Sequence, residues 1–289
     1  MISKENDIIK VIENNYSGFS KRQRLIADFI VNHYDKAVYM TASQLGESAG
    51  VSESTVVRFA AELGFEKYQQ LLKSLKEAMR TRLNSLQRME LASERMGNDD
   101  ILSMVLKSDI EKIFSTLNEI DKNQFDGAVE ALLGAEHIYI TGVRSAAALA
   151  SFTGFYFNLL FDNVKLINTT GADDIFEQLL RAGKNDVVLG MSFPRYSKNT
   201  LEAMKYAASC GAKVIGITDN IKSPIVKYSD YCLIARSDMD SFVDSLVAPL
   251  SVLNALIAAI GMKKKKETVE TFRQLEGIWA EYGVYDKDE

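Results

Sequence analysis

The spacing of apolar residues divides the chain into a helical front part and a back part in which short apolar runs alternate with helices. Over residues 1–78 apolar residues recur every three or four positions, which indicates helices throughout. Ser20 is placed to cap a helix over residues 21–33. One face of that helix is expected to carry Leu25, Ile26, Phe29 and Ile30. The polar, proline-free residues 80–98 predict a partly helical linker.

Residues 41–65, TASQLGESAGVSESTVVRFAAELGF, predict a helix-turn-helix. A first helix over residues 42–49 ends at Gly50, which suits a turn position with positive φ, and Ser52 can cap a second helix over residues 53–63. Apolar residues stand where two short crossed helices need contacts, at Leu45, Ala49, Val51, Val56 and Phe59. Such a motif presents its second helix to the major groove of DNA.

The second helix is expected to expose a set of polar side chains to DNA: Ser52, Glu53, Ser54, Thr55 and Arg58. Arg58 can donate to a guanine edge or a phosphate, Glu53 can accept from a cytosine amino group or orient Arg58, and the hydroxyls can bond phosphates. Gly46 departs from the usual pattern, which has Ala there. It costs about 1 kcal/mol of helix propensity but permits close helix approach. The alternative interpretation is a helical hairpin inside another kind of bundle.

The back part begins with two predicted helices, over residues 99–120 and 122–133. The first has a long apolar stripe, formed by Leu102, Leu106, Ile110, Ile113, Leu117 and Ile120. Five later apolar runs predict strands at residues 137–141, 164–167, 187–191, 213–218 and 231–235. Further helices are predicted at residues 146–161, 173–181, 197–210, 224–228, 242–259 and 267–282.

This alternation predicts a five-stranded parallel sheet with helices on both faces. The chain is therefore expected to have an all-α helix-turn-helix domain over residues 1–79, the linker over residues 80–98, and an α/β domain over residues 99–289.

Two loops at the carboxyl ends of predicted strands carry both Arg and Ser, where ligands of such sheets bind. Their candidate ligand-binding residues are Gly142, Arg144 and Ser145 after the first strand and Ser192, Arg195 and Ser197 after the third. Ser197 is placed to cap the next helix, whose free N–H groups and partial positive charge attract anions. The alternative is an ordinary capped strand–loop–helix with surface cations, although two such loops together favour an anionic ligand.

The charge and cysteine content of the chain bear on whether it binds DNA and on the cellular compartment in which it works. Residues 1–90 carry 13 Lys and Arg against 11 Asp and Glu, and the remainder carries 21 against 28, so the front part is the better match for DNA. We expect no signal peptide and no membrane span, and the two cysteines favour a reducing cytoplasm. The two histidines, His33 and His137, are expected to be structural, and no spacing indicates a metal site or a cofactor.

The motifs together resemble the RpiR family of bacterial transcription regulators, which join a helix-turn-helix domain to a flavodoxin-like sugar isomerase (SIS) domain. The segments that carry the resemblance are residues 51–59, 63–65 and Tyr68 in front, and 142–145, 192–197 and 241–249 behind. The resemblance implies a homodimer or homotetramer that binds paired half-sites of an operator in double-stranded DNA. It also implies that the SIS domain senses a phosphorylated sugar.

The phosphate loop departs from the pattern of that family, which reads Ser-x-Ser-Gly-x-Thr. Ser192 and Ser197 keep hydroxyls, whereas Pro194 replaces the middle Ser and Arg195 replaces Gly. Arg195 can compensate through its bidentate fork. In the first loop the ligand-binding Ser of the family corresponds either to Ser145 or to Ala146. The effector is therefore predicted as a phosphorylated sugar or a related anion.

The sequence thus predicts a DNA-binding regulator that is not an enzyme, with the anion favouring one arrangement of a dimer. The helix over residues 99–120 would transmit the arrangement of the dimer to the two helix-turn-helix domains, which read half-sites ~34 Å apart. One alternative is a sugar-phosphate isomerase with an accessory helical domain. Isomerisation needs a positioned base and often a histidine, and His137 is expected away from the ligand edge. Another alternative is a protein-interaction module that does not bind DNA.

Overall fold

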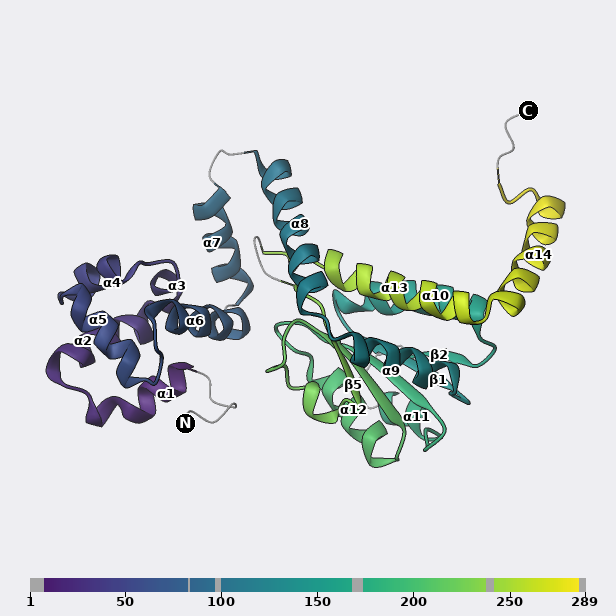
Figure 1. Ribbon diagram of the computed structural model, residues 1–289, viewed down its shortest axis with the longest axis horizontal. Helices are drawn as coiled ribbons and strands as arrows, with labels where there is room; N and C mark the ends of the chain where they lie inside the picture. Colours follow the sequence, from purple (N-terminus) through teal and green to yellow (C-terminus); the bar gives the residue numbers. More distant parts are fainter. Residues whose placement is uncertain (1–7, 83, 97–99, 168–173, 238–241, 286–289) are drawn as a thin grey trace. The chain divides into compact units, whose positions relative to one another are not determined.

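The computed structural model describes residues 8–82, 84–96, 100–167, 174–237 and 242–285. The chain forms two compact units, residues 1–98 and residues 99–289, which we call the head and the body and describe separately (Figure 1). Three positions used above lie outside the described residues: the expected helix starts at Asp99 and Asp173, and Ser241.

The head is helical wherever the structure describes regular elements. Its helices are α1 (Ile8–Asn15), α2 (Lys21–Asn32), α3 (Tyr34–Ala37), α4 (Ala42–Ala49), α5 (Glu53–Glu62), α6 (Tyr68–Arg82) and α7 (Ser85–Met96), with a 3₁₀ turn η1 at Tyr16–Gly18. The expected capping of α2 by Ser20 is confirmed, and Gln23 completes a capping box. The expectation for Leu25 was wrong, because its side chain is 46% exposed and the small Ala27 fills the buried flank of α2 instead.

The core of the head forms where α5 meets its neighbours. Val56 and Phe59 of α5 are fully buried, and the Phe59 ring lies 5.1 Å from the ring of Phe19 in an edge-to-face arrangement. The Tyr68 hydroxyl at the start of α6 donates to the Met40 carbonyl at 2.9 Å. Burial raises the pKa of Tyr68 to about 12, so this hydroxyl remains a neutral donor that holds α6 against the segment before α4.

The body contains the predicted five-stranded parallel sheet. Its strands are β1 (Ile138–Gly142), β2 (Val164–Leu166), β3 (Val187–Met191), β4 (Lys213–Thr218) and β5 (Tyr231–Ile234). They lie in the order β2-β1-β3-β4-β5, and the expected boundaries are met within one residue. The strand order reverses between β1 and β3, which makes their carboxyl ends the switch point where ligands of such folds bind.

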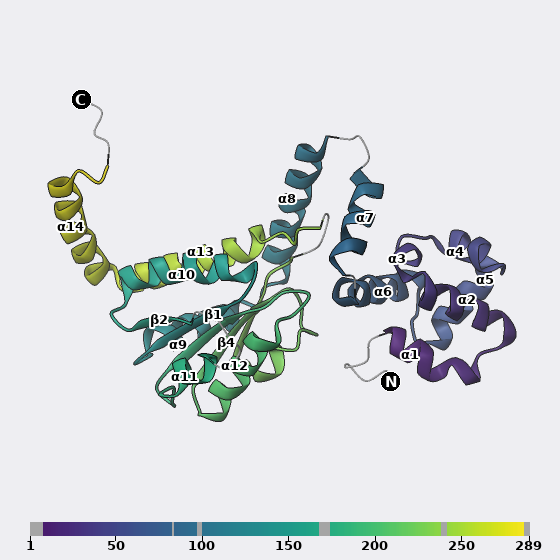
Figure 2. The same cartoon turned by 180° about the vertical axis from the view of Figure 1, so that it is seen from behind.

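Helices cover both faces of the sheet, as predicted (Figures 1 and 2). One face packs against α9 (Lys122–Leu133), α10 (Ala146–Leu160) and α13 (Val247–Lys263), and the other against α11 (Asp174–Leu179), α12 (Lys198–Ser209) and the 3₁₀ turn η2 (Val226–Tyr228). Helix α8 (Ile101–Glu119) contacts α13, and α14 (Lys265–Tyr282) follows α13 at a bend. Among the described residues no single helix is long and apolar enough to span a membrane, although α13 and α14 pass that test together across a 99° bend.

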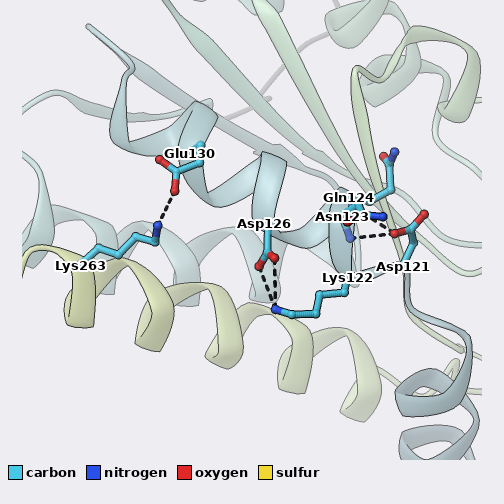
Figure 3. A network of polar contacts seen from close by, with 7 residues as sticks. All are labelled: Asp121, Lys122, Asn123, Gln124, Asp126, Glu130 and Lys263. Carbon is cyan, nitrogen blue, oxygen red and sulfur yellow. Dashed lines mark hydrogen bonds and ion pairs between the residues drawn. The ribbon is translucent and has the colours of Figure 1, made fainter.

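Polar contacts fix α9 between the sheet and α13 (Figure 3). The Asp121 carboxylate caps α9 by accepting from the Asn123 amide at 2.8 Å. Gln124 accepts from the Cys232 amide of β5 at 2.9 Å, and Glu130 pairs with Lys263 of α13. Helix α13 begins five residues after its expected start at Phe242. The preceding residues are held by side-chain hydrogen bonds instead, because the Ser245 hydroxyl donates to Asp109 of α8.

Gly46 gives a test of how tightly the two helices of the head's motif approach. A methyl group there would lie 2.8 Å from the Val51 carbonyl oxygen and 3.2 Å from the Glu53 amide nitrogen, both backbone atoms of the turn. Alanine gains about 1 kcal/mol of helix propensity, whereas overpacking costs roughly 1–3 kcal/mol. We therefore expect Gly46→Ala to lower the thermal midpoint of the head in the full chain.

Gly18→Ala is the matched control, since nothing lies within 4 Å of the added methyl group. It should leave the stability within about 0.5 kcal/mol. An unchanged or raised midpoint for Gly46→Ala would contradict the steric explanation.

Candidate functional sites

The head contains the predicted helix-turn-helix in α4, the turn and α5. Thr41 and Gln44 form a capping box at the start of α4, and Gly50 ends it in the left-handed region with φ 70°. The Val51 amide then donates to the Gly46 carbonyl at 2.8 Å, which closes the turn. Leu45, Val56 and Phe59 are buried. These contacts fix the crossing of the two helices, so α5 can present one side to a partner.

The exposed side of α5 carries four of the five predicted DNA-contacting residues: Ser52, Glu53, Ser54 and Arg58. Arg58 folds back over the preceding turn, and its Nε donates to the Ser54 carbonyl at 3.2 Å. Glu53 lies in the first turn of α5, where its charge is favourable to the helix dipole. The arrangement places one cation and several hydroxyls on the end of α5 that such motifs insert into the groove.

Two expectations about hydroxyls at this helix end were wrong. Thr55 is only 7% exposed, because it shares the face of α5 that carries Phe59 one turn later. Ser52 occupies the N-cap position but makes no side-chain bond to the backbone. Its hydroxyl instead contacts the hydroxyls of Thr55 at 2.8 Å and Ser54 at 3.0 Å. Thr55 therefore contacts Ser52 from the buried side of α5 and does not face outward.

Sequence reasoning missed a cation beside this motif. A surface hollow of about 420 Å³ lies at the turn and is lined by Arg22, Gly46, Glu47, Gly50, Val51 and Ser52. Arg22 comes from α2, outside the predicted motif, and its position beside the turn follows only from how α2 packs on α4 and α5. A cation there can neutralise a phosphate next to the groove.

In the body, the structure brings the two predicted loops to one edge of the sheet. Gly142 at the end of β1 is paired in register with Met191 at the end of β3, so residues 142–145 and 192–197 leave the sheet side by side. A methyl group on Gly142 would lie 2.7 Å from the Ala146 carbonyl oxygen, so glycine lets α10 begin this close to the strand. Arg144 is exposed and takes a positive φ of 57°. Ser145 is exposed at the N-cap position of α10 without a side-chain cap bond.

The second loop is organised by three hydroxyl groups. The buried Ser192 hydroxyl accepts from the Ser197 amide at 3.2 Å, and the Ser197 hydroxyl accepts from the Thr200 amide at 3.5 Å, so Ser197 caps α12 as expected. Arg195 lies exposed between the two serines. The Thr200 hydroxyl in the first turn of α12 is fully buried and has no hydrogen-bond partner among the described residues. Such a group costs about 1–3 kcal/mol until a ligand or water bonds it.

A third loop, after β4, supports the second one and was not identified from the sequence. The Thr218 hydroxyl contacts the Ser192 carbonyl oxygen and the Ser223 hydroxyl, both at 2.7 Å. The buried Asp219 carboxylate accepts from the Tyr196 hydroxyl at 2.8 Å and from the Asn220 side-chain amide at 2.7 Å. These bonds hold the loop containing Arg195 in place.

His137 and Cys232 are two side chains beside or in the sheet with acid–base or nucleophilic chemistry. The His137 imidazole is at the amino end of β1, away from the ligand edge as expected, and its Nδ1 is 3.0 Å from the Asp186 carboxylate. Burial, and to a lesser extent the charge of Asp219, raise the pKa of the Cys232 thiol to about 12, so this thiol is not a nucleophile near neutral pH. Among the described residues no group of three or more His, Cys, Asp and Glu is arranged to hold a metal ion.

Two family models match the chain. Residues 6–82 match the helix-turn-helix domain of the rpiR family, and residues 131–259 match the SIS domain. The chain belongs to the RpiR family. This confirms the resemblance of the sequence motifs, including the two loops at the ligand edge, which both fall within the SIS match.

HTH-type transcriptional regulators align with nearly the whole chain. An HTH-type transcriptional regulator of Haemophilus influenzae is 25% identical over 267 residues, which cover 90% of this chain and 91% of the relative. The HTH-type transcriptional regulator HexR of Pseudomonas aeruginosa is 23% identical over 267 residues, 89% of this chain and 90% of HexR. The chain is accordingly a DNA-binding transcription regulator with a SIS domain.

Solved structures share the fold. The sugar isomerase domain of an RpiR transcription factor from Sphaerobacter thermophilus is 27% identical, with a TM-score of 0.59 over 61% of this chain and 98% of that structure. The Vibrio vulnificus NanR protein, solved in complex with ManNAc-6P, has a TM-score of 0.59 and covers 95% of this chain and 98% of its own. At 18% identity NanR shows the fold alone.

Arg58 provides the test of the DNA-binding helix. We expect Arg58→Ala to weaken binding to the operator by about 1–3 kcal/mol if the guanidinium reads a base. Fluorescence anisotropy with the protein's own promoter region measures this affinity. Arg22→Ala should instead weaken binding to all sequences alike and make the salt dependence shallower. An Arg58→Ala variant with unchanged operator affinity would rule out the assigned role.

Proposed function

We propose that the body of this regulator binds a phosphorylated sugar or a related anion at the carboxyl edge of its sheet, and that binding changes the affinity of a homodimer for operator DNA. The observation that carries the proposal is the buried Thr200 hydroxyl, which lacks a partner among the described residues in the first turn of α12. It lies one turn from Ser197 and beside a loop whose position is fixed by Ser192.

Charge at this edge favours an anion. The N-terminal end of the twelve-residue helix α12 carries a partial positive charge and donor N–H groups. Arg144 and Arg195 add full positive charges from the two neighbouring loops. A phosphate monoester accepts several charge-assisted hydrogen bonds at once, which suits a site with two arginines and three hydroxyls. NanR, which has the same fold, was solved with ManNAc-6P, so the fold can hold a phosphorylated sugar.

A series of hydrogen bonds connects this edge to the helix that follows the head in sequence. The Thr218 hydroxyl contacts the Ser192 carbonyl oxygen at 2.7 Å, and the Thr218 carbonyl accepts from the Ala235 amide at 2.8 Å. The next amide, of Arg236, donates to the Thr116 hydroxyl of α8 at 2.9 Å. A ligand that moves the loop of Ser192 would thus act on α8, which supports coupling between effector and DNA affinity.

The Thr200 hydroxyl gives a direct test of the ligand site. Because this hydroxyl has no partner to lose, Thr200→Val should leave the thermal midpoint of the free protein unchanged or slightly raised. The variant should lose most of the stabilisation that the wild-type chain gains from a bound sugar phosphate. A thermal-shift series with ManNAc-6P and other hexose and pentose phosphates measures both quantities.

Thr218→Val is the matched control, since the Thr218 hydroxyl contacts Ser192 and Ser223. Its removal should destabilise the free protein by about 1–3 kcal/mol. If Thr200→Val keeps the full ligand-induced shift of the wild type, the site is not where we place it.

We also propose that the chain senses its ligand without converting it. Aldose–ketose isomerisation needs a base positioned on the substrate. The described ligand edge carries no histidine, and its buried carboxylate, Asp219, already accepts hydrogen bonds from Tyr196 and Asn220. When the protein is incubated with a sugar phosphate that shifts its midpoint, NMR should show no product beyond one equivalent. Multiple turnovers would favour the isomerase alternative.

A further inference from the structure

Helix α8 turns its apolar side to solvent and buries polar side chains. Leu102 and Leu117 are each 70% exposed and Leu106 is 54% exposed. Lys112 and Thr116, on another side of the same helix, are only 4% and 5% exposed. Helices of globular domains normally show the opposite arrangement, so the body itself does not cover the stripe that the sequence predicts.

Polar bonds prevent α8 from rotating its stripe inward. The Asp109 carboxylate accepts from the Ser245 hydroxyl at 2.6 Å, and Thr116 accepts from the Arg236 amide at 2.9 Å. Glu119 of α8 also pairs with Arg236. A rotation of α8 that buried the stripe would break these bonds and leave their polar groups without partners. The apolar side can therefore be covered only from outside the body.

The exposed area matches one side of a standard protein interface. Eight large apolar residues of α8 are exposed: Ile101, Leu102, Val105, Leu106, Ile110, Ile113, Phe114 and Leu117. Ile101 and Val105 lie on the side of Lys112 and Thr116. With roughly 180 Å² for a fully exposed residue of this size, the exposed fractions of the other six amount to about 650 Å², close to the ~800 Å² that each partner buries in a typical stable complex. Monomers rarely expose a contiguous patch of that size.

The order of these residues points to a second copy as the partner. Counted from the midpoint between Asp109 and Ile110, two pairs of apolar residues stand at the same intervals in both directions, Leu106 with Ile113 and Leu102 with Leu117. At 100° per residue these four residues lie within about 30° of one line along the helix. Four apolar positions that are placed the same way from both ends are complementary to their own antiparallel copy, as a two-fold interface requires.

We propose that α8 packs antiparallel against α8 of a second copy, about a two-fold axis passing between Asp109 and Ile110. Leu102 of one protomer then lies opposite Leu117 of the other, and Leu106 opposite Ile113. Each α8 keeps its polar bonds to Ser245 and Arg236, so the dimer axis and the ligand edge of both bodies are joined through one pair of helices. This specifies the surface of the dimer proposed above, but it requires neither DNA nor a sugar phosphate.

Cysteine cross-linking of the full chain tests the proposal. Leu102 and Leu117 are 15 residues apart, roughly 22 Å along a helix, so neither can reach its own copy in an antiparallel pair. Leu102→Cys and Leu117→Cys should each give only the background of disulfide-linked dimer seen for the unsubstituted chain. A mixture of the two variants should become largely cross-linked, and Ile110→Cys, beside the axis, should cross-link with itself.

Each other result overturns the proposal. Cross-linking of Leu102→Cys with itself would mean parallel pairing, and background levels in all samples would mean that another surface, or α7 of the same chain, covers the stripe. Sedimentation gives a second measurement: Leu106→Glu should raise the dissociation constant of the dimer at least tenfold, whereas Glu111→Gln, exposed on another side of α8, should not. Because these measurements contain no DNA or ligand, their failure leaves the proposed function to its own tests.

Discussion

The attachment of α8 to the segment after β5 is the contact on which the account of this regulator depends. Through Thr116 and Asp109 the helix is bonded to residues that follow the carboxyl end of the sheet, where α12 also begins. In sequence α8 is the first helix of the body after the head. In the function proposed here, one helix therefore receives the state of the ligand edge, determines which apolar face is left for a second protomer, and leads to the head.

The ligand edge is built from backbone geometry as much as from side-chain chemistry. The register of β1 against β3 places the two Arg/Ser loops side by side, and Gly142 lets α10 begin close to its strand. The Tyr196–Asp219 bond and the Thr218 hydroxyl then hold the second loop. Pro194 and Arg195 depart from the family's phosphate loop, yet Ser192 and Ser197 still organise the start of α12. Under the proposed function, the departure would affect which anion fits, since the edge itself is formed.

The sequence was most informative where one local rule determines the structure. Continuous apolar runs such as β3 and the left-handed turn at Gly50 were predicted closely, because a buried strand and a positive φ each restrict the residue types that can occur. The spacing of apolar residues also predicted the stripe of α8. An amphipathic pattern indicates that one face of a helix is covered, but not by which part of the structure. Whether the cover is the same domain or another copy depends on the polar bonds to Ser245 and Arg236, which come from distant segments.

The features that sequence reasoning missed share a physical cause. Tyr196 and Asp219 are 23 residues apart, and no spacing rule relates them until β3 and β4 pair in register. Arg22 reaches the turn of the head's motif only through the packing of α2. Thr55 was misassigned because the boundary between the buried and exposed sides of α5 falls within one residue of it.

The central claim is that occupancy of the body's ligand edge controls DNA binding by the head. Its most direct test is the affinity of the full chain for its own promoter region, measured by fluorescence anisotropy with and without a sugar phosphate that raises the thermal midpoint. The account predicts a change of about 5- to 150-fold, the usual range of coupling between two sites. Equal affinities, with ligand binding demonstrated in the same sample, would contradict it.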